Sequence, residues 1–357
     1  MSAEILPFPL LAIVGQAELK TALIVAVINP QIGGVLLSGP YGVGKTTAVR
    51  SLVDLLPLVE YEDLDEQGQT KLARNRMRLV ELPLNARIQD VVGGINERIA
   101  LEQRHISLEE GILAKAHRNL LYVDEINLLA PEVIDVILDA AAQGRTLVRR
   151  GPMTRLFASQ FVLIGSMNPE EGVLRPQIMD RFGLRVWVAP LEDSRLRLDI
   201  YHRAQAFRAS PSAFRLLYAE QTEELRAEVE VAREILPHVT ISPQVELATL
   251  ALIQDLKIPS HRAEIALLEA ARARAAADFR SEVTLEDVGR MAPLVLRQRR
   301  SMNLETLATK VQEENAAIME ALERVLPKEQ LVTTPLPEAS LSKPKKRRSK
   351  VRELEED

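Results

Sequence analysis

The first 190 residues alternate short apolar runs with segments of helical periodicity. Runs that are almost wholly apolar predict buried strands at Val35–Ser38, Leu79–Leu82, Leu120–Asp124, Phe161–Gly165 and Leu184–Val188. Helices are expected between them, near 45–56, 109–117 and 131–143. Continuous apolar strands that are separated by helices are typical of a parallel sheet covered on both faces. Residues 1–190 are therefore predicted to form an α/β domain with a parallel five-stranded sheet flanked by helices.

A basic segment interrupts this alternation. The sequence TLVRRGPMTRLF at 146–157 predicts a small β-hairpin that turns at Gly151-Pro152, because Gly and Pro favour turns. The hairpin carries Arg149, Arg150 and Arg155.

Beyond Pro190 the strand pattern fades and helical periodicity takes over. Helices are predicted at 193–208, 222–236, 243–256, 260–280 and 304–325. In the fourth of these, Ile265, Leu268 and Ala271 recur at helical spacing, and Ser260 is the expected N-cap. Residues 191–327 are predicted to form an all-α lid domain.

The last segment, 328–357, has a different composition. KPKKRRSK carries six basic residues in eight and is followed by the acidic ELEED. Such charge blocks are typical of a disordered tail, and the alternative is a contact for an anionic partner.

Composition restricts the class of protein. A chain of 357 residues is expected to form two domains. Its net charge of −5 makes nucleic acid an unexpected partner, and its zero cysteines exclude disulfides and thiolate metal sites. The start lacks a basic n-region and no apolar run is long enough to span a bilayer, so we expect a cytoplasmic protein without membrane contact.

The loop after the first predicted strand has the pattern of a phosphate site. LSGPYGVGKTT fits G-x-x-x-x-G-K-[ST], in which backbone N–H groups and a helix N-terminus surround phosphates. Lys45 is expected to contact the β- and γ-phosphates, and the Thr46 hydroxyl is expected to bind Mg²⁺. The predicted nucleotide contacts are Gly39, Gly42, Gly44, Lys45, Thr46 and Thr47.

Polar residues end two further predicted strands. Asp124 is expected to hold Mg²⁺ together with Thr46, and Glu125 to accept a proton from the attacking water. Asn168 is expected to orient that water, although Asn-Pro alone is an ordinary turn. ATP and Mg²⁺ are the predicted cofactors.

Two arginines are candidates for sensing or stabilising the γ-phosphate. Arg181 can act as an arginine finger from a neighbouring subunit, and Arg262, at the start of a lid helix, can report on its own subunit's nucleotide. Spacing alone leaves open a surface pair of Asp180 with Arg181 and an ordinary helix-surface role for Arg262.

These elements in this order resemble the AAA+ ATPases, and longer stretches resemble the ATPase (I) subunit of magnesium chelatase. The resemblance covers roughly residues 8–300 and is most specific in NPEEGVLRPQIMDRFG at 168–183. It implies an ATP-dependent homo-oligomeric ring, typically a hexamer, with nucleotide at each interface. It assigns the roles given above to Lys45, Thr46, Asp124, Glu125 and Asn168, a trans role to Arg181 and a lid-sensor role to Arg262. It also places adenine contacts at Val14 and Gly15.

The resemblance further implies two partners, a subunit with a von Willebrand-type domain and a large porphyrin-binding subunit. Together they insert Mg²⁺ into protoporphyrin IX on the route to chlorophyll. The sequence departs from the family pattern at Pro40-Tyr41, at the arginine-rich hairpin and at Asn119, which replaces a usual Gly and is expected to tolerate a left-handed backbone. The alternatives are a MoxR-like remodelling ATPase for another von Willebrand-domain partner, a nucleic-acid motor, and an inactive ATP-binding scaffold.

Overall fold

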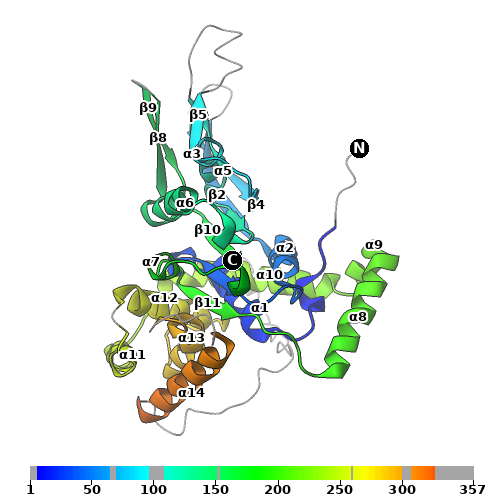
Figure 1. Cartoon of the computed structure of the whole chain (residues 1–357), viewed down its shortest axis with the longest axis vertical. Coiled ribbons are helices and arrows are strands. Elements are labelled where there is room, and N and C mark those ends of the chain that lie inside the picture. The colour runs from blue at the N-terminus through cyan, green and yellow to red at the C-terminus, as the bar shows by residue number, and fades with distance from the viewer. Residues whose placement is uncertain are drawn as a thin grey trace, which may run out of the picture.

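The computed structural model describes residues 6–64, 70–95, 108–150, 153–258, 260–299 and 307–325 (Figure 1). Its centre is a parallel five-stranded sheet in the order β11-β1-β10-β7-β4. The strands are β1 (Val35–Ser38), β4 (Leu79–Leu82), β7 (Leu120–Val123), β10 (Val162–Met167) and β11 (Leu184–Trp187). All five were predicted, with bounds that differ by at most two residues, and the α/β fold class is confirmed.

Both faces of the sheet are buried, which explains the continuous apolar runs. In β1, Val35 and Leu37 belong to one core with α1 (Ala17–Ile28) and α2 (Lys45–Ser51), whereas Leu36 faces a second core. That second core includes Leu121, Leu163 and apolar residues of α6 (Pro131–Gln143). Because successive strand residues point to opposite faces, both kinds of position must be apolar.

The remaining elements of the first 190 residues lie around this sheet. The predicted helix at 45–56 is α2 followed by a 3-10 turn at Leu52–Leu55, and the one at 109–117 is the shorter α5 (Ile112–Lys115). The structure adds three helices that the sequence did not predict, α1, α3 (Ile88–Val92) and α7 (Pro176–Met179). It also adds two strand pairs, β2 (Leu58–Leu64) with β3 (Thr70–Arg76), and β5 (Gly93–Ile95) with β6 (Leu108–Glu110).

The arginine-rich hairpin is confirmed as β8 (Arg145–Arg150) paired with β9 (Met153–Ala158), and its predicted turn at 151–152 lies outside the described residues. It projects from the sheet together with β5 (Figure 1).

Helices make up most of the described chain between residues 194 and 325. The predicted ones are α8 (Ser194–Ala209), α10 (Ala219–Ile235), α11 (Pro243–Asp255), α12 (His261–Ala277) and α14 (Leu307–Val325), and the structure adds α9 (Pro211–Leu216) and α13 (Leu285–Leu296). In Figure 1, α11 to α14 gather below the sheet, while α8 and α9 extend to one side. Within the described ranges, every helix is too short or too polar to cross a bilayer. The tail at 328–357 and residues 304–306 lie outside the described residues.

Helix α12 and Ser260 at its N-cap position are confirmed, although details of both differ, and the left-handed backbone expected at Asn119 was wrong. Ile265 is 59% exposed, and the buried face of α12 is formed by its alanines and Leu267. Ser260 occupies the N-cap position, but its hydroxyl donates to the Asp180 carboxylate and not to the helix. The left-handed backbone before β7 belongs to Arg118, at φ +59°. The Asn119 side chain instead accepts from the Arg78 N–H and donates to the His117 carbonyl.

Candidate active site

The phosphate-loop pattern forms a turn between β1 and α2. Gly39 approaches β11 so closely that a Cβ there would lie 2.3 Å from the Val188 carbonyl oxygen. Gly42 and Gly44 need no space of this kind, but their φ values of +74° and +89° are conformations that other residues rarely adopt. The glycines of the motif therefore serve two needs, close approach and backbone conformation.

Lys45 opens α2 and is half-buried. Its Nζ donates to the carbonyl oxygens of Gly39 at 2.6 Å and Pro40 at 2.9 Å. Burial lowers the pKa of Lys45, and the carboxylates of Asp124 and Glu125 oppose that shift. Among the described residues, the hydrogen bonds of this half-buried cation go to carbonyls of its own loop, so Lys45 is suited to bind an anion such as a phosphate.

Asp124, directly after β7, is the centre of a group of oxygen atoms. Thr46 Oγ1 lies 3.1 Å from Asp124 Oδ2, Tyr122 Oη donates to Oδ1 at 2.7 Å, and Ser166 Oγ also donates to Oδ1. Burial alone would raise the pKa of Asp124, but the hydrogen bonds from Ser166, Tyr122 and Thr46 outweigh it and lower the pKa. Asp124 is therefore held ionised beside the Thr46 hydroxyl.

This oxygen-rich arrangement fits Mg²⁺. Among the described residues, no group of three or more His, Cys, Asp or Glu side chains is placed to hold a metal alone. Mg²⁺ is usually held by one or two carboxylates together with substrate phosphates, so Asp124 and Thr46 suit an ion that arrives with a nucleotide.

Glu125 adopts the left-handed conformation, with φ +49° and ψ +49°, which is strained for a residue with a Cβ. Its N–H donates to Ser166 Oγ at 3.0 Å, so the same hydroxyl fixes both acidic residues. Burial raises the pKa of Glu125, and the charges of Glu171 and Asp124 raise it further. A carboxylate with a raised pKa is a better proton acceptor.

Asn168 follows β10 and is buried. Its Oδ1 accepts from the Glu170 N–H at 3.2 Å, but its Nδ2 has no hydrogen-bond partner within the described part of the chain. A buried donor without a partner is costly, so this amide is suited to a bound phosphate or water.

One cavity of ≈ 240 Å³ brings most of these predicted residues together. Its lining includes Gly42, Gly44, Lys45, Thr46, Thr47, Asp124, Glu125 and Asn168.

Val14 and Gly15 lie in a separate turn beside the segment that follows β11. A Cβ on Gly15 would lie 3.0 Å from Leu191 Cδ2, and Gln16 Nε2 donates to the Ala189 carbonyl at 2.7 Å. The same segment contains Val188, which contacts Gly39. The turn is therefore near the phosphate loop without lining its cavity, and the adenine role of Val14 and Gly15 stays a prediction.

Arg181 and Arg262 do not line the cavity of their own chain. Arg181 donates to Asp139 of α6 at 2.8 Å, which replaces the surface pair with Asp180 that spacing had left open. Arg262 is half exposed, and its Nη1 lies 4.0 Å from Asp180 Oδ2. Their roles at the γ-phosphate stay predictions.

Asp180 connects the sheet to the lid domain, which the sequence analysis missed. Its carboxylate accepts from Ser260 at 2.7 Å and from Arg299 at 2.5 Å, and Arg185 lies 3.8 Å away. The aspartate was visible in DRFG, but no local pattern indicates partners 80 and 119 residues away.

Tyr122 and Ser166 were also missed as site residues. Each is a polar side chain within an otherwise apolar strand, and that irregularity is the signal that identifies them. Tyr41, which lines the cavity, was noted only as a departure from the family; a hydrogen bond with Glu171 raises its pKa.

Comparison with known proteins agrees with this geometry. The sequence profile of the family described as magnesium chelatase, subunit ChlI, matches residues 9–173, and that of an AAA lid domain matches residues 249–322. A magnesium-chelatase subunit ChlI homolog from Methanocaldococcus jannaschii is 40% identical over 310 residues, which are 82% of this chain and 85% of the relative. The ChlI subunit of a Synechocystis species is 38% identical over 313 residues, 82% of this chain and 88% of its own.

A crystal structure named for an ATPase of Cytophaga hutchinsonii has a TM-score of 0.59 at 20% identity, and the match covers 87% of this chain and 91% of that one. At this identity the likeness supports the AAA+ fold alone. From the profile match and the two relatives, the chain belongs to the family of the magnesium chelatase ChlI subunit, within the AAA+ superfamily.

Proposed function

We propose that this chain binds and hydrolyses ATP, and that the energy drives insertion of Mg²⁺ into protoporphyrin IX by magnesium chelatase. The observation that carries the proposal is the arrangement of Lys45, Thr46, Asp124, Glu125 and Asn168 around one cavity. Each has the charge or hydrogen-bonding capacity that its role needs. Within the described ranges, the Asn168 Nδ2 has no hydrogen-bond partner and Lys45 donates to carbonyls, so both can turn to a phosphate.

The residues divide the work of hydrolysis. Lys45 offers positive charge to the terminal phosphates, and Thr46 together with Asp124 would hold the Mg²⁺ that arrives with ATP. Bound Mg²⁺ would neutralise charge on the phosphates. Glu125 accepts the proton of the attacking water, and the Asn168 Nδ2 orients that water or a phosphate oxygen.

Arg181 supports a site completed by a second copy of the chain. Its side chain is 31% exposed and bonded to Asp139, which itself is 58% exposed, so the pair lies at the surface and away from the chain's own cavity. A guanidinium at that place can serve a neighbour's γ-phosphate in a head-to-tail ring, which we propose to be a hexamer. Arg262 would then sense the nucleotide from the lid.

The proposed partners are the von Willebrand-domain subunit and the porphyrin-binding subunit of the chelatase. This chain is incubated with both partner subunits, with protoporphyrin IX and with Mg²⁺. Mg-protoporphyrin, detected by its absorption and fluorescence, should form only when ATP is present. ATP hydrolysis without Mg-protoporphyrin would contradict the chelatase role and favour a remodelling ATPase for a different von Willebrand-domain partner.

Replacement of the predicted base tests the hydrolysis step separately. Glu125→Gln should retain ATP binding, measured by isothermal titration, and lose about 10²- to 10⁴-fold in turnover. Unchanged turnover would remove Glu125 from the role of general base.

Mixed rings test the trans role of Arg181. Glu125→Gln subunits still offer an intact Arg181, and Arg181→Ala subunits still offer an intact Glu125. A 1:1 mixture should therefore regain activity at about one quarter of its interfaces, one half times one half. The matched control is a mixture of Glu125→Gln with Lys45→Ala, in which no interface is complete. Equal, negligible activity in both mixtures would refute the shared site.

A further inference from the structure

A cavity of ≈ 720 Å³ lies at the opposite ends of the sheet's strands from the nucleotide site. Its lining includes Asn119 and Val162, at the amino ends of β7 and β10, whereas the phosphate loop follows the carboxyl end of β1. The cavity is three times as large as the one beside the phosphate loop and falls in the range of small-molecule sites. No step of ATP hydrolysis proposed above uses it.

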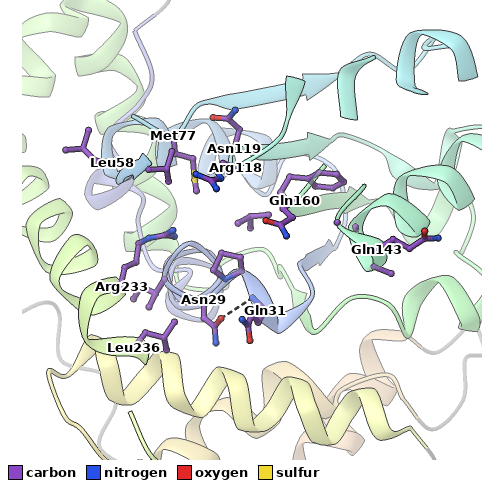
Figure 2. Close-up of a pocket in the computed structure, with 18 residues that line it drawn as sticks. Asn29, Gln31, Leu58, Met77, Arg118, Asn119, Gln143, Gln160, Arg233 and Leu236 are labelled. Carbon is purple, nitrogen blue, oxygen red and sulfur yellow. Dashed lines mark hydrogen bonds between the residues drawn. The ribbon is translucent and has the colours of Figure 1, made fainter. Parts of the chain in front are cut away.

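The wall of this cavity combines apolar surface with positive charge. Leu58, Met77 and Phe161 provide apolar surface, Gln160 provides an amide, and Arg118 and Arg233 provide two guanidinium groups. No Asp or Glu is among the lining residues that the structure describes. Figure 2 shows the side chains of Arg118 and Arg233 extending into the cavity, the first from the sheet side and the second from α10.

Arg118 is held in an unfavourable backbone conformation. Its φ of +59° is left-handed, a conformation that a residue with a Cβ rarely adopts. Its N–H donates to the Gln160 carbonyl at 2.5 Å, so a hydrogen bond between two lining residues holds Arg118 in this conformation. Strained residues are concentrated at binding and catalytic sites, and here the strained residue is one whose guanidinium lines the cavity.

Arg233 lies on α10, and its guanidinium is partly buried. Its Nη1 donates to the Val27 carbonyl, and burial lowers the pKa of the guanidinium. Within the described ranges, neither Arg233 nor Arg118 forms an ion pair with a carboxylate. The nearby carboxylate of Glu269 accepts from Asn29 and is paired with Arg272.

We propose that this cavity binds a small organic anion, a molecule with an apolar body and at least one carboxylate, sulfonate or phosphate group. The apolar wall would hold the body, and Arg118 and Arg233 would hold the acidic group or groups by charge-assisted hydrogen bonds. Because the wall combines strands of the sheet with α10, an occupant would contact both halves of the chain. The proposal does not depend on ATP hydrolysis or on the partners of the ring.

The test uses two probes of similar apolar body and different charge. Anilinonaphthalene sulfonate is an anion, and N-phenyl-1-naphthylamine is its uncharged counterpart. The full chain is titrated with each by fluorescence, in the presence of saturating Mg-ATP so that the phosphate loop is occupied. Arg118→Gln and Arg233→Gln should each weaken binding of the anionic probe about tenfold or more, as the loss of one charged hydrogen bond predicts, and leave the neutral probe within about twofold.

The matched control is Arg226→Gln, on the same helix α10 as Arg233. Arg226 pairs with Glu223 and does not line the cavity, so neither probe should change its affinity. Anion binding that is equal in native chain and both cavity variants would overturn the proposal, as would equal weakening in the Arg226→Gln control.

A second measurement needs no variant. Modification of arginines by phenylglyoxal, located by mass spectrometry, should be slowed at Arg118 and Arg233 by the anionic probe and left unchanged by the neutral one. Absence of protection would refute the site even if a variant failed to fold.

Discussion

Asp180 is expected to hold the lid domain to the sheet, and Asp180→Asn tests this with almost no change in volume. The Asp180 carboxylate is bonded to Ser260 and Arg299 and lies near Arg185. The side chains of Arg299 and Arg185 are only 1% and 3% exposed, whereas that of Asp180 is 32% exposed. The substitution therefore removes the negative charge from two guanidiniums that water cannot reach.

The size of the effect follows from what remains around the arginines. Removal of one partner of a buried ion pair costs about 3–5 kcal/mol when the other charge has no replacement. Arg299 keeps hydrogen bonds to the carbonyls of Val295, Phe182 and Gly183, and Arg185 keeps three of its own. Burial already lowers the pKa of Arg185 to about 9, so its charged form is poorly stabilised. We expect Asp180→Asn to lower the free energy of unfolding by about 2–3 kcal/mol.

The assay is urea unfolding followed by the fluorescence of Trp187, the chain's single tryptophan, which lies at the end of β11. Arg262→Gln provides an internal contrast, because Arg262 is 52% exposed and 4.0 Å from Asp180, so its loss should cost less than about 0.5 kcal/mol. Asp139→Asn is a second exposed control. An Asp180→Asn chain within about 0.5 kcal/mol of the native one would show that carbonyls alone suffice for the buried guanidiniums.

Three further predictions concern other parts of the chain. The neutral ring of His117 accepts a backbone N–H at 3.2 Å, and burial lowers its pKa, so its stabilising contribution is complete above pH ~6.5 and is lost as the pH falls through the folded value. Urea midpoints at pH 8 and pH 5.5 should therefore differ less in His117→Gln than in the native chain. Gly183→Ala should destabilise by about 3 kcal/mol or more in the same assay, because its Cβ would lie 1.8 Å from the Ile32 carbonyl oxygen; a stable variant would contradict this. Ser166→Ala should raise the Mg²⁺ concentration for half-maximal ATP hydrolysis at least about tenfold, because Ser166 fixes Asp124; an unchanged Mg²⁺ dependence would exclude that role.

The sheet was predictable from the sequence because burial on both faces leaves an unambiguous apolar run. Leu36 and Leu37 face different cores, and both positions must exclude polar side chains. The buried face of α12 could not be predicted in this way, because alanines surround the helix and Ile265 is exposed. The sequences of the hairpins β2–β3 and β5–β6 carry charged residues without a regular apolar stripe, so they give no comparable signal.

The nucleotide site was predictable where residues stand at strand ends or in a glycine-rich turn. Asp124 and Asn168 follow apolar strands, and parallel strands bring their carboxyl ends to one edge. Ser166 and Tyr122 lie inside such strands and resemble core positions until the partners of their hydroxyl groups are seen. Asp180 could not be interpreted locally, since its partners come from two distant helical segments.

The left-handed backbone at Glu125 sets stability and turnover against each other at one residue. A left-handed φ costs a residue such as Glu roughly 1–2 kcal/mol, and Asn tolerates that region better. Glu125→Asn should therefore resist urea slightly better than the native chain while it hydrolyses almost no ATP. Selection for stability alone, without selection for ATP hydrolysis, is therefore expected to favour replacement of Glu125, the proposed base.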